Sequence, residues 1–128
     1  MSEATDPLAW AEKAEEDLTV VRFSLRRKDP LTPMACFHAQ QAAEKYLKAA
    51  LVARTVVVPK THDLVLLNRL CADVGFISGI HEDDLDVLSM QAVKARYPGD
   101  APTLEDAREA LATAKLVRQV TRGWLGLT

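Results

Sequence analysis

The segment Lys60-Thr61-His62-Asp63-Leu64 places a titratable imidazole beside a lysine at the predicted start of a helix. A histidine in the first turn of a helix favours its neutral form, because the helix dipole disfavours the imidazolium cation. His62 is therefore a candidate for ligand contact or proton transfer, together with Lys60. The alternative is a structural histidine whose ring hydrogen-bonds the preceding connector.

Four polar side chains form a ridge on the helix predicted for residues 32–54, on the side opposite its apolar stripes. Their spacing of three, four and three residues places them along one side of that helix. They are His38, Gln41, Lys45 and Lys48. The two lysines are candidates for contact with phosphate or with an RNA backbone. An ordinary solvent-exposed face is the alternative, here and for Lys115, Arg118 and Arg122 of the last predicted helix.

The segment Arg96-Tyr97-Pro98-Gly99 follows another predicted helix. In a cleft, Arg96 could hold a phosphate while Tyr97 stacks on a base or hydrogen-bonds to it. The alternative is plain capping and packing at the end of the helix.

Other common chemistries lack their motifs in this sequence. It has no glycine-rich phosphate-binding loop, no HExxH or Cys/His zinc cluster and no GxSxG elbow. The acids of the segment 81–86 resemble a metal-binding loop, but the start of a helix explains them better. Cys36 and Cys71 are expected to be buried thiols in a reducing compartment. No cofactor or metal is expected.

Charge is distributed unevenly along the chain. The 16 basic and 18 acidic residues give a net charge of −2, which argues against a strongly basic nucleic-acid-binding protein. Residues 22–60, however, contain eight basic and two acidic residues. Such a segment can form one basic face for an anionic partner, or ordinary solvated helix faces.

The composition favours a compact helical protein. Among 128 residues there are 19 alanines and 17 leucines, but only 5 glycines and 6 prolines. Alanine and leucine are strong helix formers, whereas glycine and proline interrupt helices. No apolar run approaches the roughly 18 to 20 residues that a membrane span needs. The first residues, which contain three acids, do not look like a signal peptide, so we expect a cytoplasmic protein.

Apolar periodicity and capping residues predict five helices. The first helix is capped by Asp6, the third by Thr61 and the fifth by Thr103, with Asp106 completing a capping box. The predicted ranges are 7–28, 32–54, 62–74, from 82 to before 98, and from 103 to Gly123 or Gly126. Residues 55–60 are expected to form an extended connector. We predict one domain, residues 1–128, folded as an all-α, up-and-down antiparallel bundle of four to five helices.

Several of these segments together resemble a known family. They are Ala14-Glu15-Glu16-Asp17-Leu18, the run Phe37 to Ala49 with the core QQAAEK, Lys60-Thr61-His62-Asp63-Leu64, and Ala95-Arg96-Tyr97-Pro98. Their order and spacing resemble a stand-alone prokaryotic HEPN domain (higher eukaryotes and prokaryotes nucleotide-binding). The resemblance implies a helical bundle, usually a homodimer, often encoded beside a minimal nucleotidyltransferase and described as its substrate-binding partner.

The resemblance also implies a possible enzyme. Some members of the superfamily are toxin-like, metal-independent ribonucleases that use an arginine followed, four to six residues later, by a histidine. Arg96 occupies the arginine position, but no histidine follows it in this sequence. We therefore expect a non-catalytic nucleotide- or RNA-binding module, with Arg96, Tyr97, His62, Lys60, Lys45 and Lys48 as candidate ligand contacts. The alternatives are a ribonuclease toxin of a toxin–antitoxin pair, using a histidine from another helix such as His62, and a structural dimerisation protein without a ligand.

Overall fold

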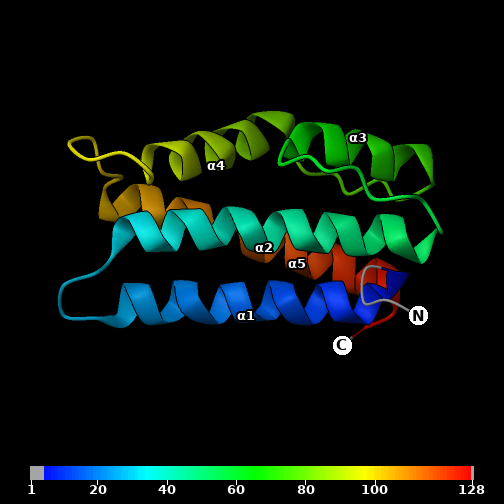
Figure 1. Ribbon diagram of the computed structural model, residues 1–128, viewed down its shortest axis with the longest axis horizontal. Coiled ribbons are helices and arrows are strands. Elements are labelled where there is room, and N and C mark those ends of the chain that lie inside the picture. Colours follow the sequence, from blue (N-terminus) through cyan, green and yellow to red (C-terminus); the bar gives the residue numbers. More distant parts are fainter. Residues whose placement is uncertain (1–4, 128) are drawn as a thin grey trace.

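The computed structural model describes residues 5–127 and confirms an all-helical fold (Figure 1). Five helices account for most of this range, and it contains no strand. The helices are α1 (Pro7–Arg26), α2 (Thr32–Ala53), α3 (Leu64–Asp73), α4 (Glu82–Lys94) and α5 (Leu104–Leu125). The valines of the connector after α2 belong to no helix or strand.

Two helix starts follow the predicted capping chemistry. The Asp6 side chain accepts a hydrogen bond from the Leu8 amide at the start of α1. At α5, Thr103 and Asp106 form the reciprocal bonds of a capping box. The helix ends at Gly126, whose φ of 76° is left-handed, a conformation that glycine adopts without steric cost.

The predicted start of the third helix is wrong by two residues. Helix α3 begins at Leu64, and its cap is Asp63, whose carboxylate accepts a hydrogen bond from the Leu66 amide. Thr61 instead accepts a bond from the Asp63 amide and forms a local turn. Both Asp and Thr are good caps, and here the later of the two residues caps the helix. His62 therefore precedes α3, and the dipole argument for its neutral form does not apply.

Helices α1, α2, α4 and α5 alternate in direction, whereas the short α3 runs in the same direction as α2 (Figure 1). The chain doubles back after α2, beginning at Thr55, whose φ of 58° is left-handed. The connector runs back beside α2 before α3 begins (Figure 1). Helices α3 and α4 then lie end to end along one side of α2 (Figure 1).

Helix α2 is the centre of the bundle, as its many alanines predicted. It packs against all four other helices. Six of its alanines are completely buried: Ala35, Ala39, Ala42, Ala43, Ala49 and Ala50. Small side chains allow α1 and α5 to approach the α2 backbone closely, while Leu47, Leu51 and Tyr46 fill the remaining core.

No helix within residues 5–127 has the length and apolar character needed to cross a bilayer.

Overpacking should show how tightly α2 is held. Ala43→Leu adds three carbons at a fully buried position and should lower the free energy of unfolding by about 1–3 kcal/mol. Ala53→Leu, at the exposed end of the same helix, should change it by less than about 0.5 kcal/mol. Urea denaturation of both variants measures the difference; equal effects would contradict the packing described here.

Candidate functional site

One side of α2 carries Lys45 and Lys48, two of the sequence-predicted site residues. It lies between α1 on one side and α3 and α4 on the other (Figure 1). We call it the α2 face, defined by Phe37, Gln41, Glu44, Lys45 and Lys48. Phe37, Gln41, Glu44 and Lys48 recur at three- and four-residue intervals, which places them along one strip of the helix, and Lys45 borders that strip.

Glu44 is the centre of a buried polar network on the α2 face. Its side chain is only 4% exposed, yet it contacts three polar groups. Lys48 Nζ lies 3.0 Å from one carboxylate oxygen, and His62 Nδ1 lies 2.8 Å from the other. The Gln40 amide donates to that second oxygen and to the backbone carbonyl of His62, both at 3.2 Å. The connector before α3 is thereby attached to the middle of α2.

The network keeps Glu44 ionised. Burial alone would raise the pKa of Glu44, but hydrogen bonds from His62, Lys48 and Gln40 outweigh it and hold the pKa below its usual value. An ionised carboxylate can only accept hydrogen bonds, so His62 must donate through Nδ1. Whenever the ring is neutral, Nε2 therefore carries the lone pair. Because the His62 side chain is 73% exposed, that nitrogen is accessible to a ligand.

A second carboxylate repeats this arrangement one helix away. Asp17 of α1, whose side chain is 9% exposed, lies 2.8 Å from His38 Nδ1 and 2.6 Å from Lys45 Nζ. Each carboxylate thus binds one histidine and one lysine. These pairs join α1 to α2 along the border of the α2 face.

The ridge on α2 was predicted to lie opposite the packed side of the helix, but it is largely covered. The side chains of Lys48, His38 and Lys45 are only 8%, 21% and 24% exposed. Lys48 also lies over the Trp10 ring of α1, 5.8 Å from its centroid. The spacing of residues within α2 predicted a shared side of the helix. It could not predict that Asp17 of α1 and Glu44 of α2 neutralise Lys45 and Lys48.

Arg96 and Tyr97 lie just after α4, near the first turns of α2. The Arg96 guanidinium lies over the Phe37 ring, 5.8 Å from its centroid, which is a cation–π contact. The Phe37 ring in turn meets the edge of His38. Tyr97 is 64% exposed, and the Arg96 side chain is exposed as well. Lys60, on the connector beside His62, is also exposed.

Arg96 and His62 therefore border the same strip of α2. Arg96 rests on Phe37 and His62 on Glu44, seven residues further along the helix. At 1.5 Å per residue, these two contact points are about 10 Å apart along the axis. The sequence did not indicate this alignment, because the two residues come from different connections and meet only through α2.

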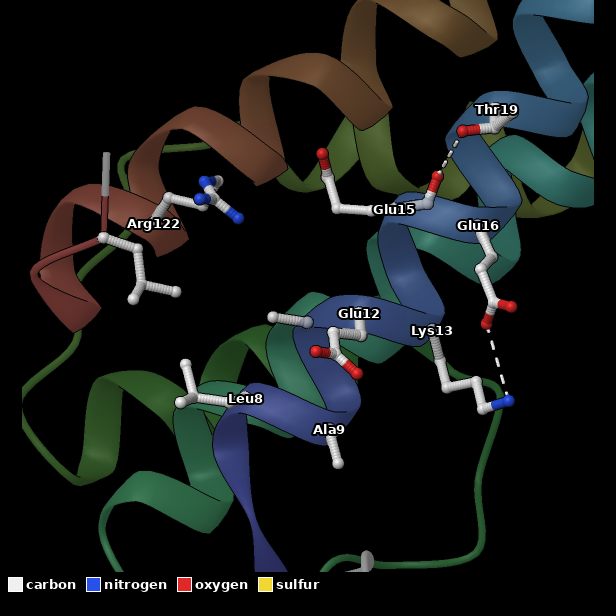
Figure 2. A pocket seen from close by; sticks show the side chains of 10 residues that line it. Leu8, Ala9, Glu12, Lys13, Glu15, Glu16, Thr19 and Arg122 are labelled. Carbon is white, nitrogen blue, oxygen red and sulfur yellow. Dashed lines mark hydrogen bonds and ion pairs between the residues drawn. The ribbon is translucent and has the colours of Figure 1, made fainter.

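A second polar cluster lies on the opposite side of α1, in a groove between α1 and α5 (Figure 2). Arg118 Nε is 2.9 Å from the Glu15 carboxylate, which also accepts a hydrogen bond from the buried Tyr46 hydroxyl. Burial raises the pKa of Glu15, but the bonds from Arg118 and Tyr46 outweigh it and lower the pKa overall. Arg118 and Arg122, candidates for phosphate contact by spacing, are here directed to Glu15 and to the Tyr46 hydroxyl.

The two cysteines are buried free thiols, as predicted. Burial raises the pKa of Cys36 to about 11 and that of Cys71 to about 12, so both remain protonated at neutral pH. In the described part of the chain, no three His, Cys, Asp or Glu side chains are grouped so that they could hold a metal ion.

The free energy of unfolding should depend on pH in a way that reveals the contribution of Glu44. A carboxylate whose pKa is lowered by folding stabilises the fold above its unfolded pKa of about 4.3, and that contribution disappears as pH falls through the folded value. Glu44→Gln should therefore cost about 3 kcal/mol of unfolding free energy at pH 7. It should also reduce the loss of stability between pH 7 and pH ~3.

Urea titrations at the two pH values measure both effects. Glu109→Gln is the matched control, because Glu109 is exposed on α5 and forms no ion pair within residues 5–127. A Glu44 variant with the same acid dependence as the wild type would contradict the network.

Comparison with known proteins identifies the family of this chain. Neither the curated proteins nor the solved structures include a match to this chain. The family model of the HEPN domain matches residues 8–124, from the first turn of α1 to the last turn of α5. This match confirms the resemblance seen in the sequence: the chain belongs to the HEPN domain family.

Proposed function

We propose that this HEPN domain is a non-catalytic module that binds a nucleotide or RNA along the α2 face. The observation that carries the proposal is the alignment of Arg96 and His62 on one strip of α2, with contact points about 10 Å apart. The strip lies between α1 on one side and α3 and α4 on the other, and apart from Phe37 its side chains are polar. A ligand with a phosphate at one end and hydrogen-bonding groups at the other would suit it.

Each exposed side chain has a distinct proposed role. Arg96, which lies over the Phe37 ring, presents its guanidinium to a phosphate. Tyr97, exposed beside it, provides a stacking surface for a base. At the other end, His62 Nε2 accepts a hydrogen bond, and Lys60 supplies a second positive charge.

The buried acids do not oppose such a ligand. Asp17 and Glu44 are each paired with a lysine, Lys45 or Lys48, so their negative charge is locally neutralised. In this proposal Lys45 and Lys48 contribute to the positive field over the α2 face. Their ion pairs make them weaker contacts than Arg96.

Three further parts of the proposal come from the family rather than from this site. We propose that the chain forms a homodimer and that it acts with a minimal nucleotidyltransferase. We also propose a cytoplasmic location, to which the free thiols of Cys36 and Cys71 are suited.

Removing the Arg96 guanidinium should weaken binding selectively. Arg96→Ala should lower affinity for mononucleotides or short RNA about tenfold or more, because a charge-assisted hydrogen bond contributes about 1.5–3 kcal/mol. Calorimetric titration of the full chain with each ligand at fixed salt measures the change.

Arg108→Ala is the control, since Arg108 is an exposed arginine on α5, away from the α2 face. If neither ligand class binds the wild type, or if the two variants bind equally well, the assignment of the site is wrong.

A second candidate function is metal-independent cleavage of RNA. It is favoured by the Glu44–His62 contact, because a carboxylate that fixes an imidazole tautomer is a common arrangement for general base catalysis. Under this hypothesis purified protein cleaves RNA in EDTA, and both Arg96→Ala and His62→Ala slow cleavage about 100-fold or more. Intact RNA after prolonged incubation with the wild type would eliminate the enzyme hypothesis.

A further inference from the structure

A hollow between the second half of α1 and α5 is lined, within residues 5–127, by cations and by no acid. Helices α1 and α5 pack on α2 much more than on each other, and the hollow lies in the space between them. Its volume is about 500 Å³, a size that suits a small ligand. Its lining consists of three basic residues, one amide and two apolar residues, which are Arg22, Lys115, Arg118, Gln119, Ala112 and Leu116.

Two of these cations have no partner among the described residues. Arg22 is half-buried, yet it forms no ion pair and no side-chain hydrogen bond with the rest of the described chain. Lys115 is exposed and is unpaired in the same sense. Partial burial weakens the hydration of the Arg22 guanidinium, and residues 5–127 supply no acceptor in exchange. An anion in the hollow would supply one.

The third cation, Arg118, is held in place and still has donors to offer. It donates to both oxygens of the Glu15 carboxylate, at 3.2 and 2.9 Å, through Nε alone. A guanidinium has five N–H donors, so this contact does not exhaust Arg118. Glu15 also accepts a hydrogen bond from the buried Tyr46 hydroxyl, which fixes the carboxylate and with it the Arg118 side chain. Arg118 is therefore a positioned donor, although Glu15 offsets part of its charge.

The hollow is separate from the α2 face. Arg22 lies about 140° around α1 from Asp17, whose pairs with His38 and Lys45 border the α2 face. Arg26, one turn beyond Arg22 on the same side of α1, is exposed and adds to the positive field at the hollow. The two surfaces therefore lie on different sides of α1, and binding at one can be measured without the other.

The placement of the cations favours a chain of phosphates over a single phosphate. Arg22 approaches the hollow from α1, whereas Lys115 and Arg118 approach it from α5, one turn apart. A guanidinium can bind two oxygens of one phosphate, while an ammonium is a compact charge that suits a neighbouring phosphate. The Gln119 amide adds a neutral donor. One phosphate could not satisfy groups that come from both helices as well as two or three linked phosphates could.

We propose that the hollow between α1 and α5 binds a linear oligophosphate of two or three phosphates, either as the free inorganic anion or as the phosphate chain of a larger ligand. Arg22 contacts the ligand from α1, and Lys115 and Arg118 contact it from α5. This site is independent of the ligand proposed for the α2 face, so either of the two proposals can fail while the other holds.

An acid placed in the hollow tests the location while leaving every cation in place. Ala112→Glu puts a carboxylate at an exposed position of the lining and should lower affinity for inorganic triphosphate at least about tenfold. Ala72→Glu is the matched control, because it makes the same change of charge at an exposed position on α3. Calorimetric titration of the full chain with inorganic triphosphate, at fixed low salt and without divalent metal, measures both affinities.

Removing the unpaired guanidinium is the complementary test. Arg22→Ala should also weaken triphosphate binding about tenfold or more, because it removes charge-assisted hydrogen bonds. Arg69→Ala removes the same charge from exposed α3 and should change affinity less than about twofold. Arg96→Ala should leave triphosphate binding at the hollow intact, because Arg96 belongs to the α2 face.

Three results would overturn the oligophosphate site. The first is a wild type that does not bind triphosphate, and the second is equal binding by Ala112→Glu and Ala72→Glu. The third is a loss of binding in Arg96→Ala but not in Arg22→Ala, which would place the anion on the α2 face. Orthophosphate that binds as tightly as triphosphate would contradict the choice of a phosphate chain. Equal affinities for inorganic triphosphate and a nucleoside triphosphate identify the free chain as sufficient, whereas tighter binding of the nucleotide identifies a larger ligand.

Discussion

The buried carboxylate of Glu44 attaches the connector before α3 to the central helix α2. It lies on the central helix and is almost completely covered, so its charge must be compensated locally. Lys48 compensates it from one turn further along α2, and His62 from the connector. These contacts fix where the returning connector meets α2. They therefore also fix where α3 begins, which tautomer of the His62 ring is present and which of its nitrogens is accessible.

The dependence of the connector on a tertiary contact explains which part of the fold could be predicted from the sequence. Helix ranges depend on local periodicity and capping, and these were predicted well at Asp6 and Thr103. At α3 two capping residues, Thr61 and Asp63, stand two positions apart, and local rules could not choose between them. The direction of α3 depends on the return of the connector to Gln40 and Glu44, which is a tertiary contact and has no local signal.

The candidate site was harder to predict, because contacts between helices decide which of its side chains are exposed. His62 and Arg96 were identified from residue type and position, and both lie on the exposed surface beside α2. The ridge of His38, Lys45 and Lys48 looked exposed because the spacing within a helix reveals only a shared side. Its partner Asp17 is 21 positions before His38, so the pairing depends on how α1 and α2 align. Asp17, Gln40 and Glu44 were not predicted as site residues, although each belongs to a motif that matched the family.

The central claim is that ionised Glu44 holds the His62 ring through Nδ1 and leaves Nε2 accessible on the α2 face. Long-range proton–nitrogen NMR of ¹⁵N-labelled imidazoles measures this directly at pH ~9, where an ordinary imidazole is neutral. The structure predicts that the neutral His62 ring carries its proton on Nδ1. A His62 ring protonated mainly on Nε2 would contradict the Glu44 contact, and with it the placement of the connector and the proposed site.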